Sequence, residues 1–322
     1  MKGYVFGAYM DFKCMAGKCP ATCCSGWKIV VDREAYDRFA LLENDELRED
    51  ILSNIISQEG KLSFKNRADG SCAMLDKDGL CRIQRNSDEK TLCNTCRKYP
   101  RLSYKKEDFS ILSMAASCPV VISYLCQENK DGVWYQMLED KKIFPVLSEK
   151  ISELNEEIKR FDILFQKIRE KFFLKADMLC ELFYDFAEIG VELVIECKDC
   201  IYLDGSFDLY ETELDEAKFQ NKVYSFEKLL YGEKLLNFEK NYIEYRIFTT
   251  KYENDSGESL DRLYQIAGEI IMNRVIMLSL CQSDKENFEQ NLYKSMHWIY
   301  KTSVHGKISG SKLHKKIMKI LA

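Results

Sequence analysis

The feature that most restricts how this chain can fold is the concentration of cysteine in its first third. Fourteen cysteines occur among 322 residues, and nine of them lie from position 14 to position 118. They include an adjacent Cys23–Cys24 pair and a Cys93-x-x-Cys96 pair, which the packing of helices does not generate. Since no export signal is visible at the N-terminus, we expect a cytoplasmic, reducing environment, where clustered thiols bind metals more often than they form disulfides.

The histidine content narrows the kind of metal site. All three histidines, His297, His305 and His314, lie near the C-terminus, so a site in the cysteine-rich part would consist mainly of thiolates. Four thiolates suit an iron–sulfur cluster or, as the alternative metal, zinc. We expect four or more ligands from one group of residues, with Cys14 less favoured: Cys19, Cys23, Cys24, Cys72, Cys81, Cys93, Cys96 and Cys118. The alternative is that these cysteines bind no metal and are buried as small hydrophobic side chains.

Two sharper interpretations of the cysteines do not fit the spacing. Radical enzymes that use S-adenosylmethionine usually carry Cys-x3-Cys-x2-Cys, and Cys19 and Cys23 begin that spacing, but Gly26 occupies the third position. A thioredoxin-type redox pair at Cys93 and Cys96 would need a neighbouring βαβ unit, and the surrounding sequence does not alternate in that way. We therefore expect a site that binds a metal rather than one of these two redox types.

Composition excludes several classes of protein. Hydrophobic residues make up 46% of the chain and charged residues 31%, with a net charge of -5, which is too apolar for a disordered protein. The apolar runs are far shorter than the roughly 20 residues needed to span a bilayer. The mild acidity argues against a protein that coats nucleic acid. We expect neither a membrane nor a nucleic-acid partner.

Proline placement divides the chain into two parts. All four prolines, the last of them Pro145, lie in the first 145 residues, and proline interrupts helices. We therefore expect a mainly α protein with an irregular cysteine-rich metal domain at 1–130, followed by an all-α domain at 131–322. Within the first domain, Asp76-Lys77-Asp78-Gly79 predicts the turn of a short β-hairpin that brings Cys72 near Cys81.

Apolar residues at steps of three and four predict the helices. In the second domain they are expected at 147–172, 178–195, 221–248, 260–281, 287–300 and 312–321. One further helix at 32–57 would separate the two groups of cysteines in the first domain. The sequence does not single out a catalytic residue, because 18 tyrosines and 52 acidic residues give no basis for a choice.

Several segments resemble the flagellin lysine-N-methylase family, part of a wider group of cysteine-cluster proteins with a Cys-Cys pair. The resemblance covers about residues 4–125 and rests on the order and spacing of six segments. They are Phe12-Lys13-Cys14, Cys19-Pro20-Ala21-Thr22-Cys23-Cys24-Ser25-Gly26-Trp27, Cys72-Ala73-Met74-Leu75-Asp76, Gly79-Leu80-Cys81-Arg82-Ile83-Gln84, Cys93-Asn94-Thr95-Cys96-Arg97-Lys98-Tyr99-Pro100-Arg101 and Ser117-Cys118-Pro119.

The resemblance implies a methyltransferase that acts on lysine side chains of flagellin. It further implies S-adenosylmethionine as the methyl donor and a four-iron (4Fe-4S) cluster held by some of the cysteines, which we take as structural. Trp27, Arg97, Tyr99 and Arg101 lie in the matching segments, and we expect them to line a pocket or to pack on the cluster. No Gly-x-Gly-x-x-Gly sequence follows a predicted strand, so the donor would bind in an architecture other than the Rossmann fold.

Two alternatives to this enzyme stay open at the level of sequence. One is a non-enzymatic adaptor, in which a metal stabilises the cysteine-rich part and the helices bind a partner protein. The other is a metal or redox protein of the wider cysteine-cluster group. The adaptor accounts for the thiols and for the missing nucleotide-binding motif.

Overall fold

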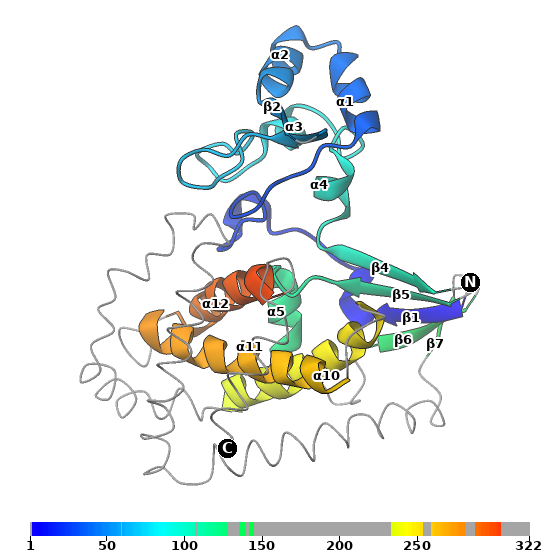
Figure 1. The fold of residues 1–322 in the computed structure, drawn as a ribbon, viewed down its shortest axis with the longest axis vertical. Coiled ribbons are helices and arrows are strands. Elements are labelled where there is room, and N and C mark those ends of the chain that lie inside the picture. Colours follow the sequence, from blue (N-terminus) through cyan, green and yellow to red (C-terminus); the bar gives the residue numbers. More distant parts are fainter. Residues whose placement is uncertain are drawn as a thin grey trace.

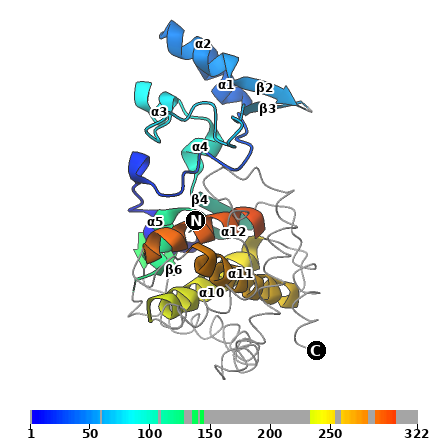
Figure 2. The ribbon, with the colours of Figure 1, turned by 90° about the vertical axis from the view of Figure 1, so that its left-hand side faces the viewer.

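The computed structural model describes residues 2–58, 60–106, 109–127, 135–139, 142–144, 233–253, 259–280 and 287–303. These residues form a small lobe and a larger body, seen from two sides in Figures 1 and 2. We use "small lobe" for residues 24–98, with α1 (Arg33–Ala40), α2 (Asp45–Ser53), β2 (Ile55–Gln58), β3 (Lys61–Phe64), α3 (Arg82–Asn86) and α4 (Asn94–Lys98). The body combines a five-stranded sheet with helices from both halves of the chain.

The small lobe is built around a compact apolar core. Phe39, Ile51 and Ile83 are at most 1% exposed and pack together with Phe64 and Met74. One helix was expected at 32–57, and the structure instead has two helices and a strand. The reason is local: the side chain of Asn44 accepts a hydrogen bond from the Leu47 N–H at 3.0 Å, which caps the start of a new helix.

The turn expected at residues 76–79 is present. Leu75 and Cys81 form an antiparallel bridge, and the Asp76 N–H donates to the Leu80 carbonyl oxygen at 2.8 Å. Gly79 has a φ of +78°, a conformation in which glycine avoids steric strain. The returning chain does not continue as a strand, because helix α3 begins at Arg82, directly after the bridge.

The sheet of the body joins segments that are distant in sequence. Its strand order is β4-β5-β1-β6-β7, with β1 at Lys2–Phe6, β4 at Arg101–Lys106, β5 at Phe109–Met114, β6 at Tyr135–Glu139 and β7 at Lys142–Phe144. Strand β1 runs parallel to β5, and the other neighbours are antiparallel. The approach of β1 to β5 requires glycine, because a Cβ atom on Gly3 would lie 1.7 Å from the Ser110 carbonyl oxygen.

Among the described residues, α5 (Pro119–Leu125) and α10 (Glu233–Glu253) pack with this sheet. Helices α11 (Ser259–Leu280) and α12 (Phe288–Ser303) pack in turn against α10 and α5. Phe6 of β1 meets Tyr124 of α5 and Tyr245 of α10 edge-on, with ring centroids 5.3 and 5.5 Å apart. The side-chain amide of Asn241 donates to the Leu125 carbonyl oxygen at 2.8 Å, which satisfies a carbonyl group that the end of α5 leaves open. The first strand is thus fixed to helices from the far end of the sequence.

The second half of the chain is less uniform than its apolar pattern indicates. Helices α11 and α12 match those expected at 260–281 and 287–300, and α10 covers the later part of the one expected at 221–248. Strands β6 and β7 lie in the part that was expected to be all-α, and β6 pairs with β1 across the domain boundary placed near residue 130. That expectation was wrong for residues 135–139 and 142–144, because strand pairing depends on a partner elsewhere in the chain. The helices expected at 147–172, 178–195 and 312–321 lie outside the described residues.

None of the helices in the described ranges is long and apolar enough to cross a membrane.

Candidate metal centre

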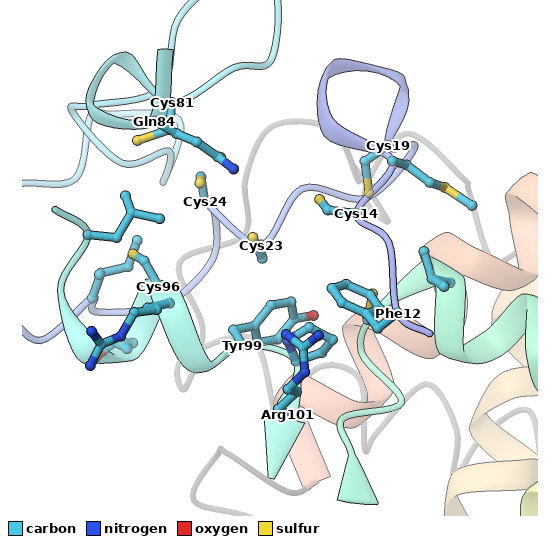
Figure 3. Close-up of a pocket in the computed structure, with 18 of the residues that line it drawn as sticks. Phe12, Cys14, Cys19, Cys23, Cys24, Cys81, Gln84, Cys96, Tyr99 and Arg101 are labelled. Atoms are coloured by element: carbon cyan, nitrogen blue, oxygen red, sulfur yellow. The ribbon is translucent and has the colours of Figure 1, made fainter. Parts of the chain in front are cut away.

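A pocket lined by sulfur lies where the small lobe meets the body. Its volume is about 240 Å³, and Figure 3 shows thiols pointing into it from several segments. Seven cysteines line it: Cys14, Cys19, Cys23, Cys24, Cys81, Cys96 and Cys118. Cys72 and Cys93 do not line the pocket but lie in the core of the small lobe, packed with three of the lining cysteines. All nine cysteines of the first 118 residues therefore gather in or beside one place.

The Cys23–Cys24 segment is held by bonds from both sides. The Trp27 indole N–H donates to the Cys23 carbonyl oxygen at 2.7 Å. The Cys72 N–H donates to the Cys24 carbonyl oxygen, also at 2.7 Å. The second bond joins cysteines that are far apart in sequence, so the adjacent pair is fixed against the loop that carries Cys72.

Helix α4 presents the Cys93 and Cys96 thiols. The carboxylate of Asp32 caps α1 by accepting from the Ala35 N–H at 3.0 Å, and it also accepts from the Asn94 N–H at 2.7 Å. The Thr95 hydroxyl donates to the Val30 carbonyl oxygen at 2.9 Å. These bonds tie the first turn of α4 to the segment that leads into α1, and thereby fix the position of both thiols.

The remaining thiols come from outside the small lobe. Cys118 directly precedes α5, where Pro119 begins the helix. Cys14 and Cys19 flank a short 3-10 turn, η2 (Ala16–Lys18). This turn rests on the small lobe, because a Cβ atom at Gly17 would lie 3.0 Å from the Asp78 carbonyl oxygen. The pocket is thus closed by a loop near the N-terminus and by the start of a body helix.

The acidity of the thiols reflects burial and crowding. Burial raises the pKa of the Cys72 and Cys118 thiols to about 12. The pKa of Cys23 is well above its usual value, first because of a hydrogen bond with Cys24 and then because of burial. Each thiolate would oppose ionisation of its neighbours. Several thiolates can therefore coexist here only with positive charge among them, as a bound metal provides.

The four residues singled out beside the cysteines, Trp27, Arg97, Tyr99 and Arg101, all line the pocket. Trp27 meets Tyr99 edge-on, with ring centroids 5.2 Å apart, and the Tyr99 hydroxyl lies 3.1 Å from the Ser117 hydroxyl. The guanidinium of Arg101 lies over the ring of Phe12, 5.1 Å from its centroid. Burial raises the pKa of Tyr99 well above its usual value, so this phenol stays protonated at neutral pH.

Sequence reasoning missed other lining residues, among them Phe12, Gln84 and Glu89. A signal existed for Gln84, which lies three residues after Cys81 and so on the same face of a helix. Glu89 had no such signal, since it belongs to a loop whose position depends on the tertiary fold. Glu89 is the acidic side chain among the described residues of the pocket wall.

The arrangement bears on the kind of metal. Within the described ranges, no group of three or more His, Cys, Asp or Glu side chains is placed to hold a single metal ion. A tetrahedral zinc site needs four ligands that converge on one atom, whereas the ligands of an iron–sulfur cluster bind different iron atoms and lie further apart. All ten described cysteines are thiols rather than disulfides. Cysteine thiols of this kind are the donors that iron–sulfur clusters use.

Comparisons with known proteins give the family. The chain is 34% identical to the flagellar biosynthetic protein FliU of Salmonella muenchen over 125 residues, which are 36% of this chain and 72% of FliU. This protein belongs to the FliU family. It is also 33% identical over 125 residues to proteins named lysine-N-methylase from Salmonella typhimurium (strain LT2) and Salmonella choleraesuis (strain SC-B67).

The match covers 36% of this FliU-family chain and 30% of each lysine-N-methylase, so the chain matches less than a third of their length. The names of these two relatives describe a methylase that acts on lysine. No family model matches the chain. No solved structure matches it either.

Proposed function

We propose that this FliU-family protein is a lysine N-methyltransferase that modifies flagellin, with S-adenosylmethionine as methyl donor. One observation carries the proposal: a pocket in a relative of lysine-N-methylases combines apolar walls, two arginines and a carboxylate with seven thiols. The names of the relatives support the reaction class and the flagellar partner. The pocket supports the proposal because it offers a place for the reaction.

The reaction requires a neutral lysine amine. Methyl transfer forms a bond between nitrogen and the methyl carbon, breaks the bond between that carbon and the donor sulfur, and releases one proton from the amine. Free lysine has a pKa of about 10.4, and an apolar environment lowers it. Phe12, Trp27 and Tyr99 line the pocket, and these apolar walls would favour the neutral amine.

Two charged side chains have distinct roles in this proposal. Arg101 lies over Phe12 and forms no ion pair with a carboxylate in the described part of the chain. A guanidinium placed in this way suits a carboxylate, such as that of the methionine moiety of the donor. Glu89 lines the same pocket and is our candidate to accept the amine proton. Tyr99, protonated, suits donation of a hydrogen bond instead.

The cysteines would hold an iron–sulfur cluster in this protein. The candidates remain those expected from the sequence, together with Cys14, which lines the pocket with the others. When bound, the cluster would supply the positive charge that the crowded thiolates need and would fasten the small lobe to the body. Zinc stays the alternative metal.

The test combines the anaerobically assembled protein with flagellin and S-adenosylmethionine that carries a trideuterated methyl group. Mass spectrometry of flagellin peptides is expected to show the labelled methyl on lysine, and the same mixture without the protein is expected to show none. Unlabelled flagellin after incubation with cluster-loaded protein would refute the enzyme. Stable flagellin binding without methyl transfer would then favour the adaptor. A change in the oxidation state of the bound metal would favour the redox protein.

A further inference from the structure

The nine cysteines fall into two sets that occupy different places. We call Cys24, Cys72, Cys81, Cys93 and Cys96 the core set, because all five belong to or pack against the apolar core of the small lobe. We call Cys14, Cys19, Cys23 and Cys118 the loop set, because they lie outside that core. Figure 3 shows Cys24 and Cys81 on one side of the pocket and Cys14 and Cys19 on the other, with Cys23 between them.

The core set is embedded in one folding unit. Cys72 and Cys93 are 4% and 1% exposed and share a core with Met74 and Ile83. Backbone bonds bring its members together, from Cys72 to Cys24 and across the Leu75–Cys81 bridge. A metal bound here would therefore stabilise the small lobe itself, in the way that small loop-rich units often use metals.

The loop set instead joins separate parts of the molecule. Cys14, Cys19 and Cys23 come from the N-terminal loop, whereas Cys118 precedes α5 of the body. Cys14 is exposed and Cys19 is half-buried. A metal bound here would fasten the loop to the body beside Tyr99 and Arg101.

The two sets meet at Cys23 and Cys24, which are adjacent in the chain.

We propose that this chain binds two separate iron–sulfur clusters, one held by four of the core-set thiols and the other by the four loop-set thiols. Four thiolates complete one cluster, and nine crowded thiols exceed that requirement. The proposal rests on the iron–sulfur part of the proposed function and is independent of methyl transfer. The core-set cluster stabilises the lobe, and the loop-set cluster forms one wall of the reaction pocket.

The test measures iron and acid-labile sulfide per chain after anaerobic assembly. C14S/C19S disrupts the loop set and C81S/C96S disrupts the core set, at exposed or half-buried positions that disturb the fold least. C126S is the control, because Cys126 is a half-buried thiol that does not line the pocket. Circular dichroism establishes that each variant retains wild-type secondary structure.

We expect each double variant to retain about half of the wild-type iron and sulfide, and C126S to retain all of it. Loss of all iron in folded C14S/C19S would show one shared cluster, and no loss would show that the loop set binds none. Zinc in place of iron would also overturn the proposal. If C81S/C96S does not fold, C14S/C19S alone decides between these outcomes. If each double variant retains half of the iron and the wild-type protein transfers no methyl group, the enzyme is refuted but the two clusters are upheld.

Discussion

The guanidinium of Arg82 binds the carboxylate of Asp50 through two hydrogen bonds, of 2.7 and 2.9 Å. Arg82 directly follows Cys81 and begins α3, whereas Asp50 lies on α2. The pair therefore fixes the position of the Cys81 thiol relative to the helices of the small lobe. Beside a cysteine, an arginine also suits neutralising thiolate charge, but these two bonds direct Arg82 to a carboxylate.

Replacement of Arg82 by glutamine is expected to destabilise the protein by about 1–2 kcal/mol, because a two-bonded, half-buried ion pair is lost. Unfolding by denaturant measures the free energy of unfolding of each variant. Arg33→Gln is the matched control, since its ion pair with Asp37 is largely exposed and contributes less than about 0.5 kcal/mol. Equal losses in the two variants would show that the Arg82–Asp50 pair contributes no more than a surface pair.

Much of the helical architecture could be predicted, and the sheet could not. Steps of three and four in the apolar residues are a local signal, and they locate α11 and α12 closely. Strand β1 has no such signal, because its partners β5 and β6 lie more than a hundred residues away in the chain. The prediction of one helix at 32–57 was wrong at Asn44, where the side chain caps the start of a second helix.

At the candidate site, the sequence predicted which residue types are present, whereas their arrangement in space depends on the tertiary fold. Crowded cysteines and the turn at Gly79 indicated that Cys72 and Cys81 lie near each other. The separation of Cys14 from Cys24 across the pocket depends on where the N-terminal loop rests. Glu89 reaches the pocket wall through tertiary contacts, which no local pattern records.

Gly3→Ala is expected to destabilise the protein by about 1–3 kcal/mol, because the added Cβ atom forces β1 away from β5. Thermal unfolding measures the loss. Gly60→Asn is the control: a Cβ atom there meets nothing within 4 Å, and asparagine tolerates its positive φ. A Gly3→Ala protein as stable as the wild type would mean that β1 and β5 do not approach so closely in solution.

Asp32 is expected to make stability depend on pH. Burial alone would raise the pKa of its carboxyl, but the N–H groups of Asn94 and Ala35 outweigh burial and hold it below the usual value. The charged form is therefore favoured on folding. Its contribution is present above the unfolded pKa of about 3.9 and is lost as the pH falls through the lower folded value.

The measurement compares unfolding free energies of wild type and Asp32→Asn from pH 7 to pH 3. We expect wild type to be more stable by about 1 kcal/mol at neutral pH, with the difference shrinking below about pH 4. Asp45→Asn is the control, since Asp45 is 77% exposed in its pair with Arg48. A difference for Asp32→Asn that stays constant with pH would contradict the role of its charge.

Arg101 is expected to bind the carboxylate of the methyl donor. Arg101→Gln removes the charge from the pocket wall, and the KM for S-adenosylmethionine should rise about tenfold or more, with a smaller change in kcat. Lys105→Gln, on the same strand β4 but outside the pocket wall, controls for the loss of a positive charge and should change neither constant. An unchanged KM in Arg101→Gln would place the donor elsewhere.

Glu89 is expected to accept the proton that the lysine amine releases. Because Glu89→Gln keeps the shape of the side chain but removes the basic oxygen, kcat should fall by about 100-fold or more, while the KM for the donor changes little. Raising the pH should partly restore the rate, since the free lysine amine then loses its proton to water. Glu34→Gln, on the exposed face of α1, is the control and should retain full activity. If Glu89→Gln were as active as this control at every pH, the pocket would favour the neutral amine by desolvation alone, and Glu89 would have no part in proton transfer.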